Sequence, residues 1–167
     1  MKTSWLSAVV FTIVLVGYFA FLDCTYSVMP PRMATHFDAQ GQANGWMNRS
    51  SAVIFQGVIG LIVPGVLLAV IFMLRFAPQK QINMPRADFW FGPEHRRETC
   101  AYIMRQGFWL ASMLVLFQYA IWYELIQSNS EKIPQLSLTV FLSVIGVFAV
   151  ALVAWVMNLF RHFRKTA

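Results

Sequence analysis

The chain has 167 residues, of which 58% are hydrophobic and only 12% are charged. Soluble domains usually have about 25% charged residues, so this composition excludes an ordinary soluble globular protein and indicates an integral membrane protein. The formal net charge of +6 requires no nucleic-acid partner, because a basic rim facing anionic lipid is a sufficient reason for it.

Four apolar runs are long enough to cross a bilayer, which takes about 20 consecutive apolar residues in a helix. They are continuous and lack the alternation of a membrane barrel, so we expect an all-α membrane protein, a single-domain four-transmembrane-helix bundle. The expected helices cover about residues 5–22, 52–74, 108–126 and 136–160. We expect the first run to be retained rather than cleaved as a signal peptide, because no clean small-x-small site follows it.

The polar loop after the first expected helix contains the most concentrated candidate chemistry in the chain. Pro30 and Pro31 fix the backbone and lack amide donors, so the chain leaves the helix in an extended conformation. Gly41 and the Asn44-Gly45 pair tolerate positive φ, which predicts tight turns. We therefore expect an ordered extracytoplasmic loop between the first two helices.

Within this loop, His36, Phe37 and Asp38 form a candidate binding element. His36 and Asp38 are candidate metal ligands or a pH-responsive contact, but two ligands are fewer than protein zinc sites use. The favoured interpretation is that both side chains hydrogen-bond the backbone of their own loop. A sharper hypothesis pairs His36 with Glu124, an ionisable residue near the outer end of the third expected helix.

Polar and small residues within the apolar runs indicate how the helices pack. Gln56, about one turn inside the second expected helix, is a further candidate binding residue. Gly57 and Gly60 share one flank of that helix and allow a neighbouring helix to approach closely. Gln118, near the middle of the third expected helix, is interpreted as an interhelical hydrogen-bonding group rather than a transport ligand.

The segment between the second and third expected helices is broken by prolines and glycines. Pro93-Glu94 is typical of a first helical turn, so the run 93–106 predicts an amphipathic cytoplasmic helix before the third span. Aromatic side chains of this segment would lie among the headgroups while arginines face phosphate, and docking of a cytoplasmic protein is the alternative. The candidate cytoplasmic interface consists of Trp90, Arg96, Arg97 and Arg105.

Lysine and arginine are unequally divided between the two sides of the expected bundle, and such residues collect on the cytoplasmic side. We therefore expect a multi-pass protein with both termini in the cytoplasm. One side has ten of these residues: Lys2, Arg75, Lys80, Arg86, Arg96, Arg97, Arg105, Arg161, Arg164 and Lys165. The other side has three: Arg32, Arg49 and Lys132.

Two segments of this chain carry a recognisable pattern. The first contains Met29-Pro30, Ala34-Thr35-His36-Phe37, Gly41 and Asn44-Gly45-Trp46; the second contains Asn83, Pro85, Asp88, Trp90 and Pro93-Glu94-His95-Arg96-Arg97-Glu98-Thr99. Together they resemble the bacterial membrane family called domain of unknown function 1648. The chain departs from the family pattern at Ala34, where proline is usual, and at Arg49, where lysine is common.

The resemblance implies a bacterial inner-membrane protein, and relatives include SdpI-like immunity proteins, which protect a cell from its own secreted toxin and can signal to a repressor. We expect a noncatalytic protein with a regulatory or immunity-type binding role, in which the His36-Phe37-Asp38 loop is a recognition element or a lid. The alternative is an accessory subunit of a larger membrane complex that uses the plain flank of the fourth helix.

A metal-dependent membrane enzyme or a small transporter fits less well. No catalytic motif is found, and Gln118 stands nearly alone among polar residues at the midplane. We expect no cofactor and no metal. The expected partners are the lipid bilayer and a protein in the membrane or at the cytoplasmic face.

Overall fold

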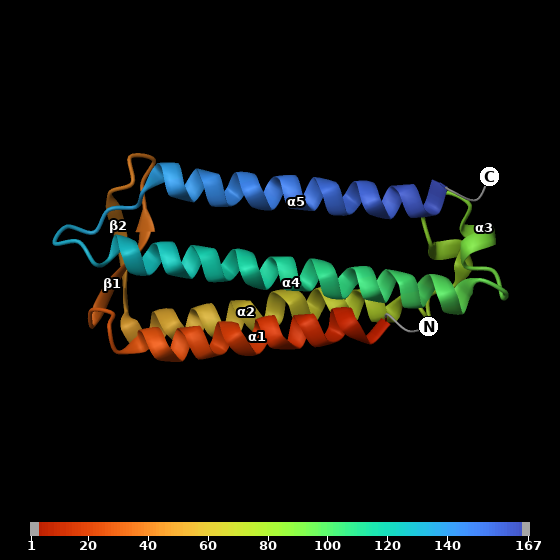
Figure 1. The fold of residues 1–167 in the computed structure, drawn as a ribbon, viewed down its shortest axis with the longest axis horizontal. Coiled ribbons are helices and arrows are strands. Elements are labelled where there is room, and N and C mark those ends of the chain that lie inside the picture. The colour runs from red at the N-terminus through yellow and green to blue at the C-terminus, as the bar shows by residue number, and fades with distance from the viewer. Residues whose placement is uncertain (1–3, 165–167) are drawn as a thin grey trace.

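The computed structural model describes residues 4–164 and consists mainly of four long helices that lie side by side (Figure 1). Each is long and apolar enough to cross a membrane, which confirms the predicted four-helix transmembrane architecture of a multi-pass integral membrane protein. The helices are α1 (Ser4–Tyr26), α2 (Arg49–Met73), α4 (Arg96–Ser128) and α5 (Leu138–Arg164).

The amphipathic helix predicted before the third span is not a separate element. Residues 96–106 form the first turns of α4, which runs without interruption for 33 residues, whereas Pro93 and Glu94 lie in a turn before the helix and are not its first turn as predicted. Gly107 lies within this helix, where α2 packs closely against it: the Cδ1 of Ile71 lies 2.6 Å from the position of an added Cβ. Between α2 and α4 the chain forms a 3-10 turn, η1 (Gln79–Gln81), and the short helix α3 (Ala87–Trp90).

A small antiparallel sheet closes one end of the bundle, which we call the hairpin end. Strands β1 (Arg32–Phe37) and β2 (Ala43–Asn48) add a sheet that the all-helical expectation did not include. The turn between them contains Gly41, which has a φ of 78°, so the predicted tight turn is confirmed there. The Asn44-Gly45 pair lies within β2 instead of forming a turn.

Gly45 is placed in the strand by close backbone packing. It lies opposite His36 at an irregularity in the register, and an added Cβ would be 2.8 Å from the Cβ of His36. A bulge of this kind needs a residue without a side chain where the two strands approach most closely. Gly45 therefore serves strand pairing rather than chain reversal.

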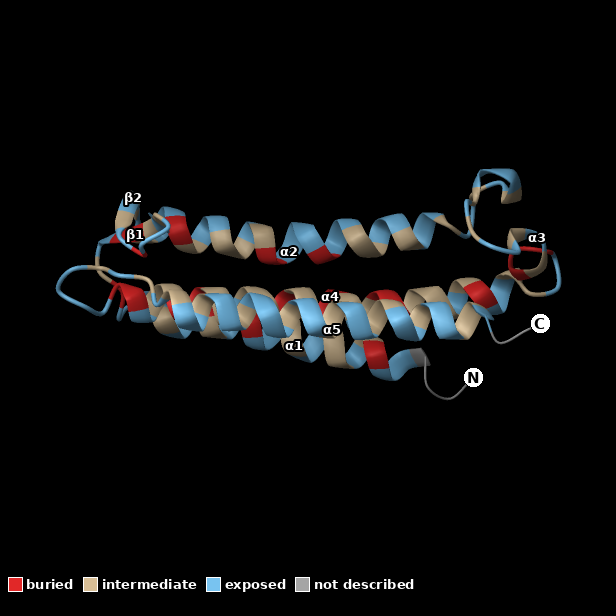
Figure 2. Ribbon diagram, turned by 90° about the horizontal axis from the view of Figure 1, so that it is seen from above, coloured by how far each residue is buried: buried red, intermediate tan, exposed pale blue. Residues whose placement is uncertain are grey.

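The core is formed by α1, α2 and α4, and α4 packs against all three other long helices. The hydrophobic core cluster lies toward the hairpin end, whereas buried residues occur along the bundle and also at the α3 end (Figure 2). Helix α5 contributes no buried residue. Trp122 of α4 is 1% exposed, and its Nε1 donates to Thr25 Oγ1 of α1 at 3.2 Å. Helices α1, α2 and α4 therefore form a compact unit, and α5 lies along the outside of this unit.

The start of α1, the end of α5 and α3 lie together at the end opposite the hairpin, which we call the α3 end (Figure 1). The predicted clustering of basic residues agrees with this arrangement. Lys2 and Lys165 lie outside the described residues. The other eight residues of the basic set lie toward the α3 end, while Arg32, Arg49 and Lys132 lie toward the hairpin end.

Candidate functional site

The hairpin is held on the bundle by the side-chain amide of Asn129, the residue that follows α4. Asn129 Oδ1 accepts a hydrogen bond from the amide of Ala34 at 2.8 Å, and Asn129 Nδ2 donates to the carbonyl of Ala34 at 2.9 Å. Nδ2 also donates to the Leu125 carbonyl at 2.9 Å. The amide thus acts as a neighbouring strand would, pairing both backbone groups of a residue that is 0% exposed.

The loop between α4 and α5 provides a second connection, at the turn of the hairpin. The amide of Leu136 donates to the carbonyl of Gly41 at 2.9 Å, next to a bridge between Gln42 and Gln135. Glu124, which is 5% exposed, accepts a hydrogen bond from the amide of Ser137 at 3.2 Å. The turn is therefore fixed by residues nearly a hundred positions away in the sequence.

The entrance to the hairpin is held by Arg49 at the start of α2. Its Nη1 donates to the carbonyl of Met29 at 2.9 Å, and its amide donates to the carbonyl of Pro31 at 3.0 Å. The guanidinium lies 4.4 Å from the ring centroid of Tyr26, whose hydroxyl is 2.8 Å from Ser50 Oγ. These contacts join the end of α1 and the start of α2 to the segment that leads into β1.

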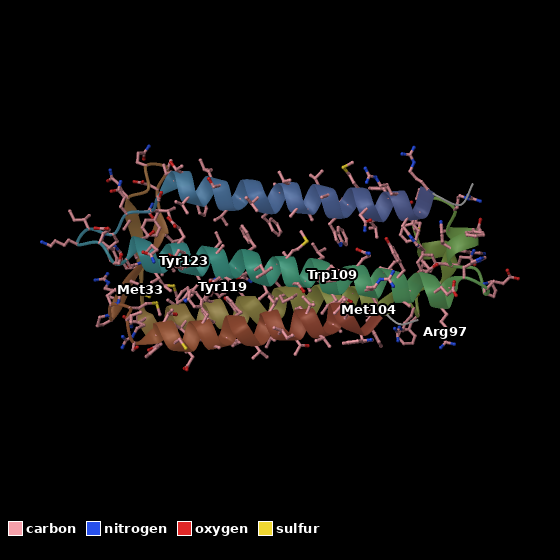
Figure 3. All side chains as sticks on the ribbon, viewed as in Figure 1. Met33, Arg97, Met104, Trp109, Tyr119 and Tyr123 are labelled. Carbon is pink, nitrogen blue, oxygen red and sulfur yellow. The ribbon has the colours of Figure 1, made fainter. Side chains whose placement is uncertain are left out.

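One face of the hairpin remains open while the other is packed. Met33, at the hairpin end in Figure 3, is fully buried beneath the sheet. Trp46 is 43% exposed, and the guanidinium of Arg32 lies 5.8 Å from its ring centroid. We call the exposed side chains of the two strands the hairpin face. It consists of Arg32, His36, Asn44, Trp46 and Asn48.

The structure separates the residues of the predicted His-Phe-Asp element. Asp38 Oδ1 accepts hydrogen bonds from the amides of Gln40 and Gln42, so the interpretation of Asp38 as a turn-forming residue is confirmed. Phe37 is half-buried at the end of β1. His36 is exposed, and the partner of its Nδ1 is the hydroxyl of Thr35 at 3.2 Å rather than a backbone group of the loop.

The sharper hypothesis, a pair between His36 and Glu124, is not supported. The carboxylate of Glu124 accepts a hydrogen bond from the Ser137 amide, and the exposed His36 has the Thr35 hydroxyl as its partner. Within residues 4–164 the two side chains therefore do not form a hydrogen bond or ion pair with each other. In the same part of the chain, no group of three or more His, Cys, Asp or Glu side chains could hold a metal ion.

Gln56 is a packing residue rather than part of the exposed hairpin face. Its Nε2 donates to Gln118 Oε1 at 3.4 Å, which confirms the interpretation of Gln118 as an interhelical group. The carbonyl of Gln56 also accepts a hydrogen bond from the Tyr18 hydroxyl at 3.0 Å. These bonds connect α1, α2 and α4 within the bundle.

Replacing Gln118 by leucine is expected to weaken the contact between α2 and α4 only modestly. Hydrogen bonds between membrane helices contribute about 0.6–2 kcal/mol, because the separated helices find other partners. We therefore expect a loss of about 1 kcal/mol in the free energy of unfolding, measured by sodium dodecyl sulfate titration in mixed micelles. Adding Gln56→Leu should cost little more, and fully additive losses would show that the two amides do not interact.

The residues of the predicted cytoplasmic interface have different roles. Arg96 Nη2 donates to three carbonyls that follow α2, those of Leu74, Arg75 and Ala77. A cation at a helix C-terminus satisfies carbonyls and complements the helix dipole, so Arg96 stabilises the end of α2.

Trp90, predicted to lie among lipid headgroups, is only 8% exposed. Its ring centroid lies 5.1 Å from that of Phe163 near the end of α5. Arg105 lies over the Tyr102 ring, with its Cζ 5.1 Å from the centroid. Arg97 is exposed and lies at the α3 end in Figure 3.

Sequence reasoning did not identify Asn129 as the residue that positions the site. An asparagine after a long helix is an ordinary helix-ending residue, so the only local signal pointed to a cap. Its partner, Ala34, is the position at which the chain departs from the family pattern. Alanine supplies the amide hydrogen that Asn129 Oδ1 accepts, and a proline would lack this hydrogen.

Comparison with protein families matches part of the chain. The family described as "Domain of unknown function (DUF1648)" matches residues 10–60, which cover most of α1, the hairpin and the first half of α2. The resemblance inferred from the first sequence pattern is therefore confirmed over these residues. The second pattern lies outside the match. No curated protein and no solved structure matches the chain.

Proposed function

We propose that this integral membrane protein, whose family match includes the whole hairpin, is noncatalytic and uses the hairpin face for regulatory or immunity-type binding outside the cytoplasm. In this proposal it is a bacterial inner-membrane protein with both termini in the cytoplasm. The excess of basic residues toward the α3 end supports that orientation, because such residues are retained on the cytoplasmic side.

The observation that carries the proposal is an exposed face on a rigidly held hairpin. Bonds from Asn129, Leu136 and Arg49 fix the sheet at three places, so little conformational freedom remains to be lost on binding. Trp46 and Arg32 are exposed on that face, and tryptophan and arginine are enriched at the centres of protein interfaces. The arrangement supports a recognition element more than a mobile lid.

The ionisable groups near the hairpin support a binding role over catalysis. Asp38 is used in the turn, and Glu124 is used to hold the loop before α5. His36 is exposed but has only a hydroxyl partner within the described chain. Within residues 4–164 neither carboxylate is hydrogen-bonded to His36, so neither orients it as a base.

If the role is of the immunity type, the protein protects a cell from a secreted toxin. Removing two side chains from the hairpin face should then abolish this protection while leaving the protein folded. Cells that lack the protein should become sensitive to medium from a culture that secretes the toxin, and expression of the unaltered chain should restore growth. The His36→Ala, Trp46→Ala double variant should raise sensitivity at least about tenfold, because one interface tryptophan commonly contributes about 2 kcal/mol or more. Growth at graded doses of the medium measures the effect.

Trp109→Ala is the matched control, because Trp109 is 37% exposed but lies on α4 away from the hairpin. It should protect as well as the unaltered chain. Both variants should keep their thermal unfolding temperature, since exposed substitutions of this kind change stability by no more than about 0.5 kcal/mol. Full protection by the double variant would refute the assignment of binding to the hairpin face.

A second candidate, an accessory subunit of a membrane complex, is supported by α5. This helix has no buried residue over its 27 residues and packs only against α4 among the long helices. A photo-cross-linking residue at Val147, which is 71% exposed, would then give a single protein adduct in stoichiometric yield. The same residue at Trp46 would give the adduct if the hairpin face is the binding surface.

A further inference from the structure

A cavity of about 520 Å³ lies at the α3 end, where the chain leaving α2 meets the start of α4. Three arginines contribute to its lining, and we call this site the arginine pocket. It is lined by Arg75, Pro93, Arg96, Arg97, Cys100 and Ala101. The site differs from the predicted interface, because Arg75 takes part in it and Arg105 does not.

The positive charge of the pocket is not neutralised by the protein. Glu94 and Glu98 are close in sequence but do not line the cavity, and among residues 4–164 no carboxylate forms an ion pair with its three arginines. Arg96 is fixed by the carbonyls after α2, which leave its charge intact. Three guanidinium groups around one cavity attract an anion, and their planar fork matches the oxygens of a phosphate group.

The depth of the pocket indicates where that phosphate comes from. Between Arg49 and Arg75 the chain contains no charged residue, and α2, which begins at Arg49, has 25 residues. At 1.5 Å per residue the helix is about 37 Å long, somewhat more than the roughly 30 Å of the hydrocarbon core. Arg75 therefore lies at the depth of the lipid headgroups, and exposed apolar side chains of α2 continue from it into the hydrocarbon.

We propose that the arginine pocket binds the phosphate of an anionic phospholipid, whose acyl chains lie along the apolar surface of α2. Arg96 is held in position by its hydrogen bonds to backbone carbonyls, and Arg75 and Arg97 are exposed and line the same cavity. The site is at the opposite end of the bundle from the hairpin face, so it is independent of the proposed binding role. The proposal thus assigns one class of lipid, anionic phospholipids, to one place on the surface of the protein.

The test measures lipid retained by the full-length protein. The protein is reconstituted with equal amounts of phosphatidylglycerol and phosphatidylcholine, extracted in mild detergent, and examined by native mass spectrometry. The unaltered chain should retain phosphatidylglycerol preferentially. The Arg75→Gln, Arg97→Gln variant should retain about tenfold less of it, since each arginine contributes to the attraction of an anionic headgroup.

A control removes the same charge at the same end of the bundle. Arg161 and Arg164 are exposed near the end of α5 and do not line the pocket. The Arg161→Gln, Arg164→Gln variant should retain phosphatidylglycerol within about twofold of the unaltered chain. Arg97→Lys keeps the charge but removes the planar fork, so retention should fall severalfold even if the double pocket variant does not fold.

Three results would overturn the proposal. Equal loss in the two double variants would mean that overall charge, not the pocket, attracts the lipid. Equal retention of phosphatidylglycerol and phosphatidylcholine by the unaltered chain would mean that the site has no preference for an anionic lipid. Displacement of the bound lipid by millimolar inorganic phosphate would identify the pocket as a site for a soluble anion.

Discussion

Replacing Asn129 by alanine is expected to release the hairpin from the bundle and to lower the free energy of unfolding by about 2–4 kcal/mol. The substitution leaves both the amide and the carbonyl of Ala34 buried without partners, and each such group costs roughly 1–3 kcal/mol. The loss should be seen in two ways: as an earlier transition on sodium dodecyl sulfate titration and as faster amide exchange across β1 and β2.

Asn44→Ala is the comparison for this substitution, because Asn44 is an exposed asparagine of the hairpin face. It should change the free energy of unfolding by no more than about 0.5 kcal/mol and leave amide exchange as it is. Unaltered exchange at Ala34 in the Asn129→Ala protein would show that the hairpin is held mainly by Arg49 and the α4–α5 loop.

The Asn129 substitution also connects stability with the proposed function. Asn129 is 8% exposed and is not part of the hairpin face, so its replacement removes no contact with a binding partner. Protection should nevertheless decline, because a hairpin that moves freely loses conformational entropy when it binds. A loss of protection without a change at the exposed face would separate the positioning of the hairpin from recognition by it.

The membrane helices could be predicted because the bilayer imposes a length and a composition that are visible in any stretch of sequence. The inner boundary of α4 was not predictable in the same way. Residues 96–107 are more polar than a membrane span, so composition placed the start of the third helix at residue 108. The helix in fact begins at Arg96. Hydropathy reports which residues lipid can solvate and not where a helix begins.

The candidate site was predicted less completely, because its positioning depends on contacts between distant residues. Asp38 forms hydrogen bonds within four residues, and its role could be inferred from the turn alone. Ala34 and Asn129 are 95 residues apart, and neither residue type gives a sequence signal for a contact with the other. The burial of Trp90 against Phe163 has the same origin, since α5 returns to the α3 end only in the folded bundle.

The second large effect is expected at Gly60 of α2, which packs directly against the Tyr18 side chain of α1. An added Cβ would overlap the ring of Tyr18, which is 1% exposed and whose hydroxyl is held by the Gln56 carbonyl at 3.0 Å. The ring cannot move aside without losing that bond. Gly60→Ala should therefore lower the free energy of unfolding by about 1–3 kcal/mol, the usual cost of overpacking a close contact.

Gly57→Ala provides the control for Gly60→Ala, because it makes the same change one turn earlier on the same helix. Its Cβ would lie 3.4 Å from the nearest side-chain atom, on Phe19, and 3.7 Å from Leu22. Alanine also favours the helix over glycine by about 0.5–1 kcal/mol, so Gly57→Ala should be neutral or slightly stabilising. Opposite signs in sodium dodecyl sulfate titration are the expected result. Equal effects would mean that helix propensity decides both, and that α1 and α2 are not held at their separation by Gly60.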